Sequence, residues 1–204
     1  MRSVVALLLV GGVASAQEIR VDDGLGTIDG AAVQKVLDEE GVKLNACYLQ
    51  DARTKRWLGG SVRLVVRVDA RGRVKRAEVA SSDLGSWDTE RCLLDGARKL
   101  QFPAPKGGDA LVQIPFDFNA SSAPEEMADG AARAAAARLR GIYRCAGGPK
   151  SVPVTLYVGA GGAIVSVGFG AVTSEAWGDC AAARAKALHV EDPLGRVLKT
   201  TVTP

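Results

Sequence analysis

The amino-acid sequence contains one pattern twice, and this repeat constrains the fold more than any other feature. Residues 60–105 superpose on residues 151–193 when one copy is shifted by about 90 positions. The matched residues are Ser61-Val62 with Ser151-Val152, Gly72-Arg73-Val74 with Gly162-Ala163-Ile164, Trp87 with Trp177 and, after a two-residue deletion, Cys92 with Cys180 and Pro105 with Pro193. Such a match is hard to obtain by chance. The sequence therefore predicts two copies of one small unit.

The first copy has the pattern of a β-hairpin followed by a helix and a further strand. Apolar residues alternate with other residues from Val62 to Val68, which predicts a half-buried strand. Residues 69–72 supply a tight turn before a return strand at 74–79. A helix is expected to begin near Ser86 and to end before Pro103. The last strand, 111–118, contains Pro115, which restricts it to a sheet edge or a solvent-facing side.

The second copy repeats this order with strands at 152–158 and 164–169, a helix at 177–188 and a closing strand at 196–203. A helix precedes each hairpin. The first is capped by Asp29 and leads to Cys47, and the second covers 131–143 and leads to Cys145. We expect an α+β protein of two tandem units, each helix–β-hairpin–helix–strand, with the helices packed on one face of a small antiparallel sheet.

The expected domain boundaries follow from this pattern. Residues 1–16 resemble a secretory signal peptide, with one charge at Arg2, a short apolar run and small residues before a cleavage site after Ala16. The apolar run is shorter than the roughly 20 residues that cross a bilayer, so we expect a soluble exported protein without membrane insertion. Residues 17–27 are expected to form a flexible lead-in, 28–118 the first domain, 119–127 a linker and 128–204 a divergent second domain.

The chain has four cysteines, two at equivalent places in each copy: Cys47, Cys92, Cys145 and Cys180. An even number of cysteines in an exported protein predicts disulfides, although four cysteines allow three pairings. The repeat favours Cys47–Cys92 and Cys145–Cys180, because each unit is then closed within itself. A zinc site is disfavoured, since there is no C-x-x-C pair and a single histidine.

No motif in the sequence assembles a catalytic or phosphate-binding site. The glycine-rich stretch 159–162 precedes a strand, whereas a phosphate-binding loop leads into a helix, so a hairpin turn is the better interpretation. His189 is the only histidine, and Gln101 occupies its place in the first copy. The sequence supplies no nucleophile and orienting acid for it. We therefore expect no enzyme activity, no cofactor and no metal.

Residues 50–57 are polar and basic, have no counterpart of equal length in the second copy and are expected to form an insertion loop. Basic side chains gather in this segment and around the first hairpin, although the formal net charge is only +3 and does not indicate a nucleic-acid partner. They are Arg53, Lys55, Arg56, Arg63, Arg67, Arg73, Lys75 and Arg76. This basic set is either an ordinary solvated face or a docking face for an acidic partner or a polyanionic envelope polymer. Trp87 and Trp177 are expected to be core anchors.

Several spaced motifs of the first unit resemble the C-terminal domain of the AgmX/PglI family. They are Cys47-Tyr48, Gly60-x-Val62, Asp69-x-x-Gly72-x-Val74, Ser81-Ser82-x-Leu84-Gly85, Cys92, Phe102-Pro103-x-Pro105 and Pro115-Phe116-x-Phe118. That family is associated with adventurous gliding motility in myxobacteria and is similar to the C-terminal domain of TonB. The second unit lacks the Pro-Phe-x-Phe ending and is a divergent copy. The resemblance implies a Gram-negative periplasmic location and a role in contacting other envelope proteins.

These observations predict a non-catalytic periplasmic interaction protein that binds a peptide or envelope-protein segment at a sheet edge, within a gliding-motility or other cell-envelope complex. One alternative is a structural scaffold whose units pack together and leave no free edge, and another is a glycan-binding envelope protein or an enzyme with an undetected pocket. The candidate partner-binding residues are Val112, Ile114, Phe116, Arg63, Arg67 and Lys75. The oligomeric state is left open.

Overall fold

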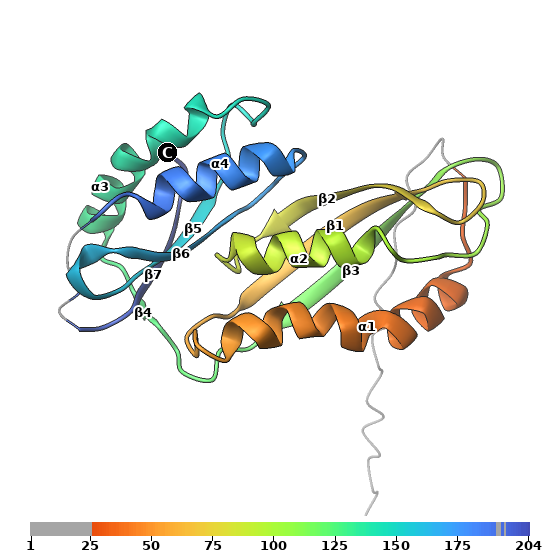
Figure 1. Ribbon diagram of the computed structural model, residues 1–204, viewed down its shortest axis with the longest axis horizontal. Helices are drawn as coiled ribbons and strands as arrows, with labels where there is room; N and C mark the ends of the chain where they lie inside the picture. Colours follow the sequence, from red (N-terminus) through yellow and green to blue (C-terminus); the bar gives the residue numbers. More distant parts are fainter. Residues whose placement is uncertain (1–25, 191–192, 194) are drawn as a thin grey trace, which may run out of the picture.

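The fold is α+β, as the repeat predicts. A computed structural model of the chain describes residues 26–190, 193 and 195–204. These residues form four α-helices and two small sheets (Figure 1). The predicted signal peptide, 1–16, and the lead-in up to residue 25 lie outside the described residues.

The first unit runs α1 (Gly30–Ala52), β1 (Gly60–Val68), β2 (Val74–Ser82), α2 (Trp87–Ala97) and β3 (Ala110–Phe118). Its antiparallel sheet has the order β2-β1-β3, and Figure 1 shows both helices over one face of it. Along β1, Val62, Leu64, Val66 and Val68 are buried against these helices, because successive side chains of a strand point to opposite faces. Helix α1 extends into the segment 50–57, which the sequence suggested to be polar loop.

The second unit runs β4 (Glu125–Glu126), α3 (Asp129–Leu139), β5 (Val154–Val158), β6 (Ile164–Phe169), α4 (Glu175–Lys186) and β7 (Leu198–Val202). A 3₁₀ turn, Arg140–Arg144, follows α3 and leads to Cys145. The sheet order is β4-β7-β5-β6. β4 pairs in parallel with β7, so this sheet is mixed and not wholly antiparallel as expected. The reason is that two residues of the expected linker, Glu125 and Glu126, join the sheet.

The two units repeat one another in detail. The Phe102 amide donates to the Gly72 carbonyl at 2.8 Å, and the Val190 amide donates to the Gly162 carbonyl at 2.8 Å. Both hydrogen bonds tie the end of a helix back to a hairpin turn. In the first unit this contact needs a glycine, because Gly72 has φ +81° and a Cβ there would lie 1.9 Å from the Phe102 carbonyl oxygen.

The two tryptophans are not structurally equivalent, which corrects one pair of the sequence match. Ser86 and Ser174 cap α2 and α4, and each lies at the same distance along the chain before the helix cysteine. Trp87 is then the first residue of its helix, whereas Trp177 is the third. The two-residue deletion therefore lies before the helix cap. Both indole side chains are buried, as expected of core anchors.

The units share one core. The segment after β6 pairs with β2: the Val79 and Val172 amides donate to each other's carbonyls at 3.1 and 2.9 Å. The Ser82 amide also donates to the Gly170 carbonyl at 3.2 Å. Buried side chains of both units form one continuous cluster. The repeat thus produces two units that are packed firmly together.

Candidate functional site: the open edge of the first sheet

The first sheet has one long edge that no described strand covers. β3 lies at the end of the order β2-β1-β3, and the opposite edge strand, β2, contacts the second unit. The closing strand expected at 196–203 corresponds to β7, which β4 covers. Of the closing strands of the two units, only β3 has an open edge among the described residues.

Proline fixes which main-chain groups of β3 face outward. Pro115 lies opposite Arg63 in the β1–β3 register, and it has no N–H to donate. In an antiparallel pair, residues that exchange hydrogen bonds with the neighbouring strand alternate with residues that do not. Pro115 belongs to the second kind, so Leu111, Gln113 and Asp117 share its orientation. Their amide and carbonyl groups point to the open edge and are available to an added strand.

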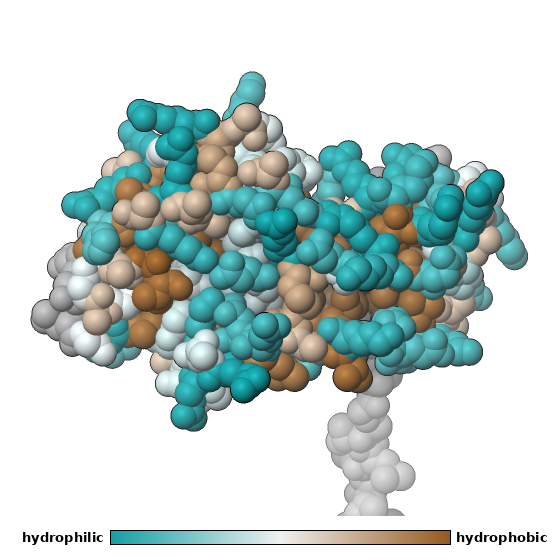
Figure 2. All heavy atoms as spheres, in the orientation of Figure 1, coloured by the Kyte–Doolittle hydropathy of each residue, from teal (hydrophilic) through white to brown (hydrophobic). Residues whose placement is uncertain are grey.

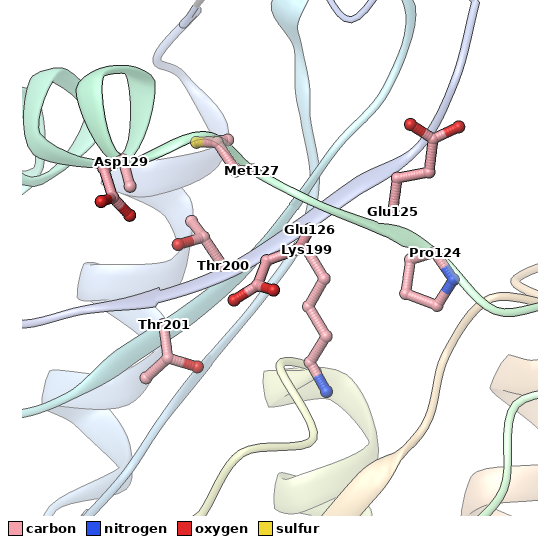
Figure 3. A pocket seen from close by; sticks show the side chains of 9 residues that line it. Pro124, Glu125, Glu126, Met127, Asp129, Lys199, Thr200 and Thr201 are labelled. Carbon is pink, nitrogen blue, oxygen red and sulfur yellow. The ribbon is translucent and has the colours of Figure 1, made fainter.

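The free edge of the second sheet is built differently. β4 has two residues, both glutamates, and a short charged strand is a common protection against unwanted pairing. Beside it lies a hollow of about 460 Å³ between β4, the start of α3 and β7, with Glu126, Asp129 and Thr201 on its wall (Figure 3). In that wall Glu125 is paired with Arg196, and Lys199 donates to the Gly59 carbonyl at 2.7 Å. We therefore regard β3 as the edge suited to pairing.

A groove runs beside the open edge. It has a volume of about 290 Å³ and lies between α1 and β3. Its walls are formed by Gln34, Leu37, Asp38, Gly41 and Leu44 of α1 and by Ile114, Pro115 and Phe116 of β3. Its lining mixes apolar side chains, such as Leu37 and Phe116, with the polar side chains of Gln34 and Asp38. A strand added to β3 would direct every second side chain toward this groove, because side chains alternate along a strand.

The side chains of two predicted contact residues are buried. Val112 and Ile114 are each 2% exposed and belong to the core under the helices. A partner at this edge would therefore meet the main chain of β3 and not these side chains. Phe116 is partly buried, lies 5.9 Å from the Phe118 ring and forms part of the groove.

The basic residues of the first hairpin are mostly paired. Arg67 and Lys75 both contact the Asp109 carboxylate at 3.1 Å, and the hydrogen bond from Lys75 is the largest cause that lowers the pKa of Asp109. Arg73 pairs with Asp69, and Arg76 pairs with Glu78. Among the described residues, Arg63 is exposed and makes no ion pair. The expected docking face is therefore far less positive than the count of basic residues suggests.

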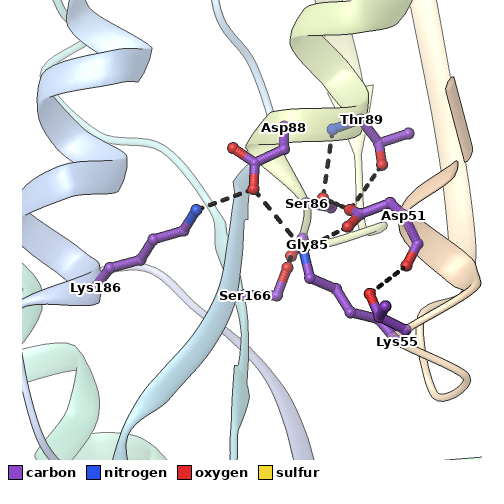
Figure 4. A network of polar contacts seen from close by, with 9 residues as sticks. Asp51, Lys55, Gly85, Ser86, Asp88, Thr89, Ser166 and Lys186 are labelled. Atoms are coloured by element: carbon purple, nitrogen blue, oxygen red, sulfur yellow. Dashed lines mark hydrogen bonds and ion pairs between the residues drawn. The ribbon is translucent and has the colours of Figure 1, made fainter.

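The joint between the units is rich in polar contacts that the sequence did not reveal. Lys55 contacts Asp51 at 2.6 Å and Asp88 at 3.7 Å, and Lys186 of the second unit contacts Asp88 at 3.0 Å (Figure 4). Burial raises the pKa of Asp51, but hydrogen bonds from Lys55 and Ser86 outweigh it and leave the pKa lowered. This network holds the ends of α1, α2 and α4 together.

Glu90 is the most unusual group in the joint. Its side chain is fully buried, and its carboxyl accepts hydrogen bonds from the Ser82 hydroxyl at 2.7 Å and from the Phe169 amide at 3.3 Å. Burial raises the pKa of Glu90 to about 8. A Cβ at Gly168 would lie 2.3 Å from the Glu90 carboxyl, so a glycine is required there. No sequence pattern indicates this role, because Glu90 lies among the other charged residues of a helix.

Trp57 is a second residue of the joint that sequence reasoning missed. Its ring lies 4.4 Å from the Tyr157 ring of the second unit. The Tyr157 hydroxyl donates to the Gly59 carbonyl at 3.0 Å, and burial raises the pKa of Tyr157 to about 12. Residues 53–59 therefore serve to dock the second unit. The only sequence signal was that this segment has no counterpart of equal length in the second copy.

Both predicted disulfides are present, Cys47–Cys92 and Cys145–Cys180. Disulfides persist in oxidising compartments, which fits an exported protein. The first disulfide lies at the base of a groove of about 450 Å³ between α1 and α2, where Figure 2 shows apolar surface between charged side chains. Leu44 and Leu100 line this groove together with Lys43 and Lys99.

Neither a metal site nor a membrane span is found in the part of the chain that the structure describes. No group of three His, Cys, Asp or Glu side chains in residues 26–190, 193 and 195–204 could hold a metal ion. Within the same residues, no helix combines the length and the apolar character that a bilayer crossing needs. His189 is exposed, and its carbonyl accepts a hydrogen bond from Arg138.

Comparison of the chain with protein-family models, with curated proteins and with solved structures gives no match. The geometry of the β3 edge and the residue motifs of the first unit are therefore the features that bear on function.

Proposed function

We propose that this protein is a non-catalytic, periplasmic interaction protein that binds an extended segment of another envelope protein by strand addition to β3. The observation that carries this proposal is the open nine-residue edge of β3, with outward main-chain groups beside the groove between α1 and β3. Main-chain hydrogen bonds supply affinity in this binding mode, and pockets for alternate side chains supply specificity.

Two further observations support the proposed setting. The first unit resembles the AgmX/PglI C-terminal domain, which implies contacts with envelope proteins in a gliding-motility or other cell-envelope complex. The two disulfides fit a periplasmic protein that is released from its signal peptide after Ala16. The pattern of the ion pairs argues against a polyanion as the main ligand, because Arg67 and Lys75 share Asp109.

The scaffold alternative explains a different part of the molecule. The pairing of β2 with residues 170–172 and the shared core give the second unit a structural role, which is to close one edge of the first sheet. β3 is not involved in that pairing. We therefore assign a structural role to the second unit and partner binding to the first unit.

A proline at position 113 tests the proposal. The Gln113 amide points outward, so Gln113→Pro removes one hydrogen-bond donor from the open edge without removing a bond to β1. Gln113→Ala is the matched control, because it shortens the side chain and keeps the amide. Proline at Val112 or Ile114 would instead break the β1 pairing and empty a core position.

The measurement is capture of periplasmic proteins by crosslinking, with identification by mass spectrometry. We expect the parent protein and Gln113→Ala to capture the same envelope protein and Gln113→Pro to lose it while remaining folded. Equal capture by all three proteins would show that the binding site lies elsewhere.

A further inference from the structure

The outer side of the second unit carries three arginines, Arg133, Arg140 and Arg144, which we call the arginine face. Arg133 lies in α3, and Arg140 and Arg144 begin and end the 3₁₀ turn that follows it. All three side chains are exposed, and none forms an ion pair with another described residue. Figure 1 shows α3 on the outside of the second unit, away from the first sheet.

Burial on the opposite side of the helix fixes the direction of this face. Ala135, Leu139 and Ile142 are fully buried and belong to the shared core. Because side chains three and four residues apart share one side of a helix, these residues occupy the inner side and leave the arginines on the outer side. The Cys145–Cys180 disulfide ties the end of the 3₁₀ turn to α4. The arginines therefore project from an anchored support.

The acidic side chains of the second unit are placed elsewhere. Glu125, Glu175 and Asp179 each contact an arginine that is not part of the arginine face. Glu126 and Asp129 lie on the wall of the hollow beside β4 (Figure 3). Residues 128–150 contain five basic residues, and Asp129 is their only acidic residue. No described carboxylate neutralises the arginine face, so its charge is available to an anionic partner.

The surroundings of the arginines distinguish between kinds of anionic partner. The neighbouring surface residues are small, with Ala134 and Ala137 exposed and Gly141 half-buried, and the Tyr143 hydroxyl is occupied as an acceptor from the Val152 amide at 3.3 Å. Protein partners usually need aromatic or large apolar anchors, which these small residues do not supply. Guanidinium groups bind phosphate bidentately and are weakly hydrated. A convex row of arginines among small residues fits a plane of phosphate groups.

We propose that the arginine face binds the phosphate headgroups of an anionic membrane surface. The contact is peripheral and electrostatic, and it inserts no helix into the bilayer. β3 belongs to the other unit, so strand addition and membrane contact are compatible. The second unit then has a surface role in addition to its structural one. This proposal goes beyond the proposed function of the β3 edge and does not depend on it.

Vesicle flotation of the exported protein tests the proposal without any protein partner. The probes are vesicles of phosphatidylglycerol mixed with phosphatidylcholine, and vesicles of phosphatidylcholine alone. We compare the parent with Arg133→Gln/Arg140→Gln/Arg144→Gln. The matched control, Arg53→Gln/Arg63→Gln/Arg71→Gln, removes the same charge from three exposed arginines of the first unit. Far-UV circular dichroism and thermal unfolding report whether each variant keeps its fold.

We expect the partition onto acidic vesicles to fall more than about tenfold in the arginine-face variant and less than about threefold in the control, because a basic residue acts on an anionic surface only within about a Debye length. The parent should not bind neutral vesicles. It should leave acidic vesicles at about 0.5 M salt, where the charges are screened within a few ångströms.

Three results would overturn the proposal. The first is a parent that does not float with acidic vesicles, and the second is an equal loss of flotation in both variants. The third is capture of an acidic envelope protein by the parent and not by the arginine-face variant, without vesicle binding, which would assign the face to a protein. Loss of partner capture at the β3 edge leaves the flotation result unchanged, so the two proposals fail separately.

Discussion

At the scale of single residues, Glu90 connects the two units most directly. Its carboxyl receives hydrogen bonds from both units, from Ser82 in the first and Phe169 in the second, and among the described residues no basic side chain pairs with it. Asp88 on the same helix adds a repulsive negative charge. A buried carboxyl in such surroundings is stable as the neutral acid, because desolvation disfavours the charged form.

Stability is therefore expected to fall as the pH rises. The pKa of Glu90 is raised by burial from 4.5 to about 8, so the folded protein holds a proton that the unfolded chain releases between these values. The free energy of unfolding then decreases across this window by at most about 1.4 kcal/mol per pH unit from this group. Urea unfolding of the parent and of Glu90→Gln at pH 5 and pH 8 measures the effect.

The glutamine variant should remove this part of the pH dependence, because it keeps an acceptor oxygen and cannot ionise. Asp95→Asn is the control, since Asp95 lies on the same helix with an exposed side chain. A Glu90→Gln protein with the same decrease in stability as the parent would contradict the assignment.

At the scale of elements, close contact between α2 and α4 depends on a glycine. A Cβ at Gly178 would lie 2.3 Å from the Trp87 ring, and the Trp87 indole donates to Asp179 of α4 at 2.8 Å. The repeat explains how this pair arose. With the helix caps aligned, Gly178 takes the place of Glu90, so the two copies diverged at the face where they meet.

Gly178→Ala is expected to destabilise the protein by about 1–3 kcal/mol, because the added methyl group overpacks the joint. Gly41→Ala is the control: Gly41 lies within α1, and among the described residues no atom outside its own helix turn lies within 4 Å of its Cβ position, so the change should stabilise by roughly 0.5–1 kcal/mol. Chemical unfolding of both variants gives the two values. A Gly178→Ala variant with the same free energy of unfolding as the parent would show that the added methyl group fits between α2 and α4 and that the glycine is not needed there.

Element prediction from the sequence succeeded where local patterns decide. The alternation in β1 and β6, the turn at 159–162 and the cysteine pairs all follow from residue spacing, and the structure confirms them. Tertiary packing decided the rest. Glu125 and Glu126 have no strand pattern of their own. They are in strand conformation because they pair with β7.

At the scale of the whole molecule, the repeat predicted two units but not their association. The joint is built from Glu90, Trp57 and glycines at positions such as 168, and none of these has a periodic pattern. The edge of β3 was predictable from Pro115, because proline excludes a central strand. The side chains that this edge presents to a partner were not predictable, because Val112 and Ile114 face the helices and are buried.

A shared core predicts that both units unfold together. Trp57 and Trp87 lie at the joint and Trp177 packs against Phe169 beside it, so tryptophan fluorescence reports opening of the joint, whereas far-UV circular dichroism reports the helices of both units. We expect the two signals to change in one coincident transition on heating, as in a two-state protein. Two separate transitions would mean that the units are independent domains.

Site-specific photocrosslinking tests the central claim, that the β3 edge binds an envelope-protein segment, most directly. A photoreactive residue in place of Leu111 lies on the proposed edge, and one in place of Leu49, which is 53% exposed on α1, is the control. We predict that position 111 crosslinks in the periplasm to one extended segment of one envelope protein and that position 49 does not. Equal crosslinking from both positions, or crosslinks from position 49 alone, would contradict the account.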